Sequence, residues 1–125
     1  MKKVTVITPY YRGEKTIFNT INSVFNSYEN VKDEINLEYI VIIDSMEDRD
    51  KIFKKLKNEY KDKIILLKNQ ENLGVAKSRN KAIKLATGDY VIFLDQDDNL
   101  DKNYFTYIKN NIEADSKVIL VNGYI

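Results

Sequence analysis

The segment VIFLDQDDNLD, residues 91–101, joins a run of four apolar residues directly to a cluster of four aspartates. An apolar, β-branched run of this length, bounded by turn residues, is typical of a strand buried in a sheet. Closely spaced carboxylates repel one another and raise each other's pKa unless a cation lies among them. The segment therefore predicts a buried strand whose carboxyl end carries acids that are either solvated or bind a cation.

Apolar runs of this kind recur along the chain and alternate with amphipathic segments. We expect strands at 4–8, 38–43, 63–68, 90–94 and from 117 onward, and helices at 16–27, 48–60, 74–87 and 102–114. Ser45 and Asp48 are candidates for a capping box at the second helix, and Thr87-Gly88 is expected to end the third. This alternation predicts an α/β fold with a mainly parallel sheet and helices on both faces.

Composition limits the classes of protein and of metal site. The chain has 125 residues, 43% of them hydrophobic, so we expect a single domain over 1–125. Its net charge of +1 gives no indication of nucleic-acid binding. The chain has no histidine and no cysteine, so a metal would take oxygen ligands, as Mg²⁺, Mn²⁺ and Ca²⁺ do.

The ends of the sequence also suggest expectations. No segment approaches the roughly 20 apolar residues of a membrane span, so we expect a cytoplasmic protein. The sequence stops at Tyr124-Ile125, inside a predicted strand and without a polar tail. We therefore expect the chain to be a domain truncated at its C-terminus.

In an open parallel sheet, ligands bind outside the carboxyl ends of the strands. Unusual residues follow four of the predicted strands: Thr8 to Tyr11, Asp44, the stretch 69–74, and the acids that begin at Asp95. These segments should meet at one edge of the sheet, which is the predicted site.

Arg79 lies four residues from both Val75 and Ile83, on the apolar face of its predicted helix. An inward arginine needs a partner, for which Asp44, Asp95 or a bound anion are candidates. A purely structural Arg–Asp pair explains the position equally well.

The acidic cluster has several interpretations. Helix capping explains Asp101 but neither Asp95 nor Asp97. An EF-hand loop that started at Asp95 would need glycine at its sixth position and glutamate at its twelfth, where the chain has Leu100 and Thr106. A phosphatase of the haloacid dehalogenase type, with Asp95 as nucleophile, remains an alternative. The last interpretation is a D-x-D motif that holds a divalent cation on a diphosphate.

Four blocks of the sequence are similar to those of a known family. They are VTVITPYYR (4–12), EYIVIIDSMED (38–48), NLGVAKSRNKAIKLATGDY (72–90) and VIFLDQDD (91–98). In this order and spacing the chain resembles the inverting family 2 glycosyltransferases of the GT-A fold. The resemblance covers the Rossmann-like, nucleotide-sugar-binding half of such an enzyme.

The resemblance implies roles for residues after the first two strands. Thr8 and Pro9 would shape the nucleobase pocket, Tyr11 would stack on the base, and Asp44 would accept hydrogen bonds from it. Ile43 stands where the family has an aspartate, which leaves the identity of the base open.

The other roles fall on the second half of the sequence. Gly74 belongs to the donor-binding set, and Arg79 would face the base or the phosphates. Asp95 and Gln96 would approach the ribose. Asp97, with Asp95, would bind Mn²⁺ or Mg²⁺ on the diphosphate.

The implied reaction is transfer of a sugar from a nucleoside-diphosphate donor, UDP by preference, to a hydroxyl of a glycan or lipid-linked acceptor, with inversion. Surface-polysaccharide synthesis at the inner face of the membrane is the usual setting. The family's general base would lie beyond residue 125, so we expect the isolated chain to bind donor without transferring sugar. A non-catalytic binding module is the further alternative.

Overall fold

The computed structural model describes residues 1–112 of the chain, and the predicted strand from residue 117 lies outside this range. Four strands and four α-helices alternate, with two short 3₁₀ helices between them. In chain order they are β1 (Lys3–Tyr10), α1 (Glu14–Tyr28), η1 (Glu29–Val31), β2 (Asn36–Ile43), α2 (Arg49–Tyr60), η2 (Lys61–Lys63), β3 (Ile65–Lys68), α3 (Val75–Leu85), β4 (Tyr90–Phe93) and α4 (Tyr104–Ile112).

The four strands form one sheet in the order β3-β2-β1-β4, and every neighbouring pair is parallel. β1 pairs along its whole length with β2, from Lys3 opposite Asn36 to Tyr10 opposite Ile43. The predicted α/β fold with a parallel sheet is confirmed. Because all strands point the same way, the loops that follow them meet at one edge.

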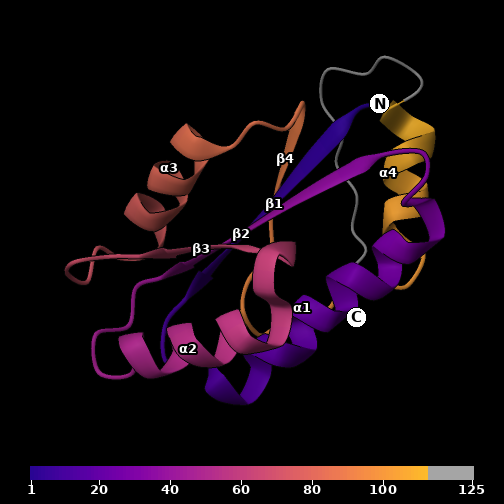
Figure 1. Ribbon diagram of the computed structural model, residues 1–125. Helices are drawn as coiled ribbons and strands as arrows, with labels where there is room; N and C mark the ends of the chain where they lie inside the picture. The colour runs from indigo at the N-terminus through magenta and orange to yellow at the C-terminus, as the bar shows by residue number, and fades with distance from the viewer. Residues whose placement is uncertain (113–125) are drawn as a thin grey trace.

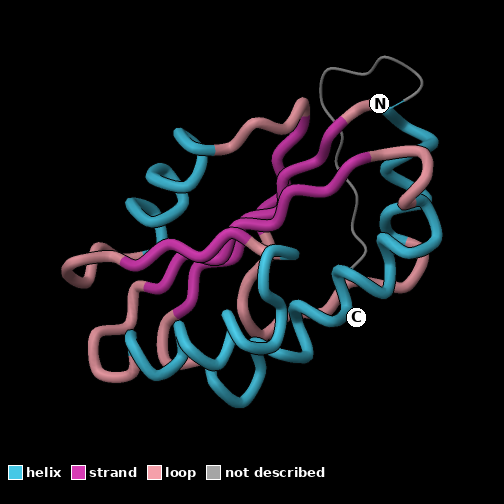
Figure 2. Tube along the Cα trace, in the orientation of Figure 1, coloured by secondary structure: helices cyan, strands magenta, loops and turns pink. Residues whose placement is uncertain are grey.

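The two faces of the sheet are covered unequally (Figures 1 and 2). α1, α2 and α4 lie on one face, and α3 lies alone on the other. Alternate residues of β1 serve the two layers: Val4, Val6 and Tyr10 belong to the larger core, and Ile7 to the smaller. Helices on both faces are therefore confirmed, with one thick layer and one thin layer.

The thin layer is centred on four buried residues: Ile7, Ile40, Ile42 and Ala82. Within α3 only Ser78 and Ala82 are fully buried. Since a single helix covers this face, the outer strands are less buried than the sequence predicts. Ile65 at the start of β3 is 42% exposed, and Val91 in β4 is 39% exposed.

Local signals at the helix ends are the part of the sequence interpretation that needs correction. The capping box of Ser45 and Asp48 is wrong, because α2 has Asp48 at its N-cap and no side chain caps it. The Asp48 carboxylate instead accepts a hydrogen bond from the Tyr10 hydroxyl, at 2.5 Å. α3 ends at Leu85, two residues before the predicted stop, and α4 begins at Tyr104 rather than at 102.

No helix in residues 1–112 is long and apolar enough to span a membrane.

Candidate functional site

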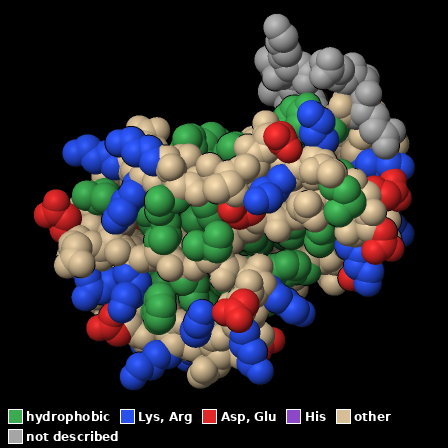
Figure 3. Space-filling view, turned by 45° about the horizontal axis from the view of Figure 1, so that its top comes forward, with side chains coloured by type: hydrophobic (Ala, Val, Ile, Leu, Met, Phe, Trp, Pro, Cys, Tyr) green, Lys and Arg blue, Asp and Glu red, His purple; other side chains and the backbone are tan. Residues whose placement is uncertain are grey.

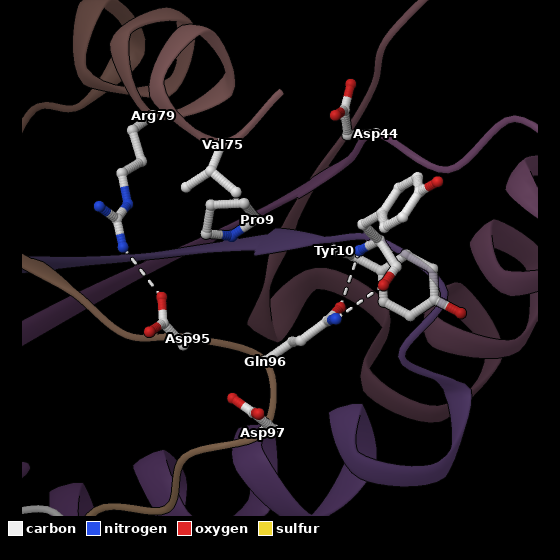
Figure 4. A pocket seen from close by; sticks show the side chains of 9 residues that line it. Pro9, Tyr10, Asp44, Val75, Arg79, Asp95, Gln96 and Asp97 are labelled. Atoms are coloured by element: carbon white, nitrogen blue, oxygen red, sulfur yellow. Dashed lines mark hydrogen bonds and ion pairs between the residues drawn. The ribbon is translucent and has the colours of Figure 1, made fainter. Parts of the chain in front are cut away.

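A cavity of about 350 Å³ opens at the carboxyl edge of the sheet, beside the N-terminal half of α3 (Figure 4). Four segments distant in sequence supply its walls: the end of β1, the residue after β2, α3, and the loop after β4. The lining residues are Pro9, Tyr10, Tyr11, Asp44, Val75, Arg79, Asp95, Gln96 and Asp97. The predicted convergence of the strand ends is confirmed.

Two of the residues that the sequence singled out lie next to this cavity rather than in its wall. Thr8 is fully buried, and its hydroxyl lies 2.8 Å from that of Tyr39. Gly74 borders a smaller hollow of about 170 Å³, which shares Tyr11, Asp44 and Val75 with the cavity. Conversely, Tyr10 and Val75 line the cavity although the sequence interpretation gave neither a binding role of its own.

Asp44, at the end of β2, is buried and holds the loop that follows β3. Each carboxylate oxygen accepts two hydrogen bonds, within 2.7–3.2 Å. The donors are Asn69 Nδ2 and the Leu73 amide on Oδ1, and Asn72 Nδ2 and the Gly74 amide on Oδ2. A carboxylate has about four lone-pair positions, so donors from the chain itself occupy all of them.

Gly74 occupies the backbone position that starts α3. Its φ of 87° lies in the region that side chains disfavour, and its amide donates to Asp44. The turn places Val75 and Arg79 of α3 at the cavity. Asn69 and Asn72 therefore act with Gly74 as a scaffold, which the NLG sequence alone did not reveal.

Arg79 reaches from α3 across the cavity to the loop after β4 (Figure 4). Its Nη2 donates to Asp95 Oδ1 at 2.9 Å, and its guanidinium carbon lies 5.0 Å from the centre of the Phe93 ring. Asp95 is thus the predicted partner of Arg79. Nε of Arg79 is buried and has no hydrogen-bond partner among the described residues, so a bound group could still accept from it.

Gln96, between the two aspartates of the D-x-D motif, is fixed to the backbone of Tyr11. Gln96 Oε1 accepts from the Tyr11 amide, and Gln96 Nε2 donates to the Tyr11 carbonyl, each at 2.7 Å. Gly13 makes room for this contact, because a Cβ there would lie 2.4 Å from Gln96 Oε1. The pair of bonds ties the loop after β4 to the end of β1.

Asp97 lies between the cavity and a second hollow of about 580 Å³. The second hollow begins at the start of α1 and contains side chains of both charges. They include Arg12, Glu14, Lys15, Glu47 and Asp48. A ligand that filled both hollows would pass beside the Asp97 carboxylate.

The acids after β4 form an open donor set for a cation. Within residues 1–112, no three acidic side chains converge into a closed metal cage. Burial, together with the charges of Asp97 and Asp95, raises the pKa of Asp98. Mg²⁺ commonly takes one or two carboxylates and completes its shell with water and substrate phosphates. Asp95 and Asp97 fit that arrangement.

Comparison with known proteins assigns the family. Residues 5–125 match the sequence family described as Glycosyl transferase family 2. The chain belongs to this family. The resemblance drawn from the four sequence blocks is confirmed by this match, which covers nearly the whole chain.

Individual family 2 relatives are longer than this chain. WfgD of Escherichia coli, a UDP-Glc:alpha-D-GlcNAc-diphosphoundecaprenol beta-1,3-glucosyltransferase, is 36% identical over 121 residues, which are 96% of this chain and 42% of that protein. The uncharacterized glycosyltransferase MJ1057 of Methanocaldococcus jannaschii is 34% identical over 117 residues, 88% of this chain and 38% of that protein.

A solved structure supports the same fold. S. aureus TarS 1-349 in complex with UDP-GlcNAc superposes with a TM-score of 0.73 and is 32% identical, over 90% of this chain and 31% of that one. The GT-A fold that the resemblance implies is therefore confirmed. This chain spans less than half the length of these three proteins.

Proposed function

We propose that the chain is the donor-binding part of a glycosyltransferase that uses a nucleoside-diphosphate sugar, with UDP as the nucleotide. The observation that carries this proposal is the convergence of Tyr11, Arg79 and Asp97 at one cavity in a family 2 chain. The UDP-GlcNAc complex of TarS and the UDP-glucose named for WfgD support the choice of nucleotide.

In this proposal the nucleoside occupies the cavity between Tyr11 and α3. Tyr11 is 42% exposed, and the guanidinium carbon of Arg12 lies over its ring, 5.0 Å from the ring centre, so the base would stack on the opposite face. Arg79 is held in place by Asp95, which directs its remaining donors into the same cavity. The diphosphate passes Asp97, and the second hollow offers room for the sugar.

A divalent cation, Mn²⁺ or Mg²⁺, would be held by Asp97 with Asp95, and when bound it would offset the negative charge that develops on the leaving nucleoside diphosphate. Arg79 adds a fixed positive charge to the same region. Gln96 keeps the D-x-D loop close to the end of β1, so that Asp97 stays aligned with the base pocket.

We further propose that the attack by an acceptor hydroxyl inverts the anomeric centre, and that the general base and the acceptor site belong to residues beyond this chain. The acceptor would be a surface glycan or its lipid-linked precursor, with the enzyme in the cytoplasm at the inner face of the membrane. The diphosphoundecaprenol acceptor named for WfgD supports this class of acceptor. Family membership favours glycosyl transfer over phosphoryl transfer at Asp95.

Titration calorimetry tests the donor site. We expect the 125-residue chain to bind UDP in the presence of Mn²⁺, and Asp97→Asn to weaken that binding by about tenfold or more, since a carboxylate ligand is lost. The exposed Asp62 is a matched control, and Asp62→Asn should leave the affinity unchanged.

Two results would contradict the proposal. A folded chain that binds no nucleoside diphosphate would refute the donor site, and equal affinity with and without EDTA would refute the metal. Sugar transfer by the 125-residue chain alone would refute the placement of the general base outside it.

A further inference from the structure

The charges of this nearly neutral chain are segregated. Residues 49–85 contain twelve Lys and Arg and only four Asp and Glu, which gives a net charge of +8. The rest of the chain contains eight and fifteen, a net charge of −7. Residues 49–85 contain the edge strand β3 with η2 before it, and the helices α2 and α3, which lie on opposite faces of the sheet. The overall charge of +1 therefore conceals a strongly polarised molecule.

Several Lys and Arg side chains lie on the surface at the left of Figure 3, with acidic side chains among them. On α3, Lys77, Lys81 and Lys84 follow one another at helical spacing, and Lys81 Nζ donates to Asn69 Oδ1 in the loop after β3. On the other flank, Lys68 Nζ lies 4.5 Å from the centre of the Phe53 ring of α2. We call eight exposed basic and aliphatic residues of this region the β3-edge surface: Lys54, Lys63, Ile65, Lys68, Lys77, Lys81, Lys84 and Leu85. Asp62 and Glu71 are exposed acids of the same region.

Most of these lysines are not neutralised by the chain. Within residues 1–112, no acid forms an ion pair with Lys54, Lys63, Lys77 or Lys84. Lys68 does approach Asp50, at 3.5 Å. Two large apolar side chains lie exposed among them: Leu85 at 54% and Ile65 at 42%. The surface thus combines free positive charge with exposed aliphatic groups.

We propose that the β3-edge surface binds an anionic lipid bilayer. Lysines near a negatively charged membrane are attracted additively, and aliphatic side chains such as Leu85 gain by entering the headgroup region. Nucleic acid fits less well, because stacking on unpaired bases needs exposed aromatic rings. The exposed large aromatics of residues 1–112 are Tyr11 and Tyr107, and both lie outside the surface.

This inference goes beyond the proposed donor site and does not depend on it. α3 contributes to both regions, since Val75 and Arg79 line the cavity while Lys77 and Lys81 belong to the β3-edge surface. Membrane binding at this surface would hold the donor cavity close to lipid-linked molecules. Vesicle binding and UDP binding can be measured separately, so either can fail alone.

Vesicle co-sedimentation of the 125-residue chain tests the proposal. We expect binding to vesicles of 60% phosphatidylcholine and 40% phosphatidylglycerol, none to pure phosphatidylcholine, and at least tenfold weaker binding by the triple variant Lys54→Glu, Lys77→Glu, Lys84→Glu. A control of equal charge change, Lys2→Glu, Lys15→Glu, Lys102→Glu, lies on exposed residues elsewhere. It should lose much less affinity. Circular dichroism establishes that both variants are folded.

The apolar residues distinguish a bilayer from other polyanions. Leu85→Ser should weaken vesicle binding severalfold without changing the net charge, because the aliphatic contact is lost. Equal loss in the two triple variants would overturn the proposal, as would binding to single-stranded RNA that exceeds binding to the anionic vesicles.

Discussion

Asp44 shows how one buried carboxylate can determine the shape of a binding site. The resemblance implies that it accepts hydrogen bonds from a nucleobase, yet donors of the chain fill all its lone-pair positions. A base would have to replace one of them, and the side-chain amide of Asn72 has the longest bond, at 3.2 Å. The organising role of Asp44 is visible without any ligand.

Replacing Asp44 should therefore cost stability as well as binding. Asp44→Asn puts an amide group where two donors already point, and we expect it to lower the free energy of unfolding by about 2–3 kcal/mol. Urea unfolding followed by circular dichroism measures this. Asp50→Asn changes an exposed acid and should shift stability by no more than about 0.5 kcal/mol. Similar values for both variants would show that the four bonds add little.

The contact between Gln96 and Tyr11 is a second feature that single residues determine. Gln96→Ala should release the Tyr11 amide, whose exchange with solvent deuterium we expect to accelerate about tenfold or more. Gly13→Ala should have a similar effect, because its Cβ would displace the Gln96 side chain. Amide exchange by NMR gives the rates.

A further variant at position 96 makes this measurement specific for the hydrogen bond. Gln96→Glu keeps an acceptor for the Tyr11 amide but loses the donor to the Tyr11 carbonyl. The exchange rate of the Tyr11 amide in Gln96→Glu should therefore fall between the rates in the original chain and in Gln96→Ala. Unchanged exchange at Tyr11 in Gln96→Ala would mean that this bond does not persist in solution.

At the residue scale, the sequence predicted which side chains line the cavity better than it predicted which residues they contact. Helical spacing correctly placed Arg79 on the same face as Val75, and both residues line the cavity. That face is not the buried one, however, because Val75 is 52% and Ile83 is 40% exposed, and the buried face of α3 carries Ser78 and Ala82. The contacts of Asp44 with Asn69 and of Gln96 with Tyr11 join residues far apart in the chain. Such contacts depend on the register of neighbouring strands, which sequence periodicity does not contain.

Between elements, Glu38 of β2 connects the sheet to the end of α3. Its carboxylate accepts hydrogen bonds from the Thr5 hydroxyl and from the amide and hydroxyl of Thr87, at 2.7–2.8 Å. Partial burial alone would raise the pKa of Glu38, but the bonds from Thr87 and Thr5 outweigh it and lower the pKa. The connection is therefore strongest when Glu38 is ionised.

The lowered pKa gives a direction for pH dependence. The pKa of a glutamate in the unfolded chain is about 4.3. A carboxyl group whose pKa is lower than this in the folded protein stabilises the fold at any pH above the unfolded-state pKa. This stabilisation is lost as the pH falls through the folded-state pKa. At pH 7, Glu38→Gln should lower the free energy of unfolding by about 1–2 kcal/mol. The deficit relative to the original chain should shrink at pH 3, as urea titrations at the two pH values would show.

An exposed glutamate provides the reference for this measurement. Glu71→Gln, in the loop after β3, should cost little at either pH. A deficit of Glu38→Gln that stayed constant or grew on acidification would contradict the assigned direction.

The order of the elements followed from the sequence because long apolar and amphipathic runs are strong local signals. The sequence predicted the exact ends of the helices and strands less accurately. The Ser45–Asp48 capping box failed because α2 begins at Arg49 and Asp48 itself is the N-cap, with its carboxylate bonded to the Tyr10 hydroxyl of another element. The unequal covering of the two sheet faces was not predicted either. An apolar run such as YVIF is compatible with a strand that helices cover on one face or on both.

On the scale of the whole molecule, one helix layer is thick and the other is thin, and the cavity at the carboxyl edge of the sheet lies beside the thin one. Only Ser78 and Ala82 of α3 are fully buried, yet this helix supplies Val75 and Arg79 to the cavity. The Gly74 turn and the Asp44 bonds anchor its start, and the Glu38 connection its end. Polar contacts at both ends therefore compensate for the small apolar core beneath α3.

The strand order has a consequence for how the chain folds. β1 is central, with Val4 opposite Leu37 on one side and Tyr90 on the other. Because β1 is synthesised about 80 residues before β4, it waits for β4 before its second edge is paired. At ~5–20 residues per second, the ribosome leaves that edge open for several seconds. Contacts between such distant segments also make folding slow, so a nascent chain of this kind exposes a reactive strand edge to chaperones and to other nascent chains.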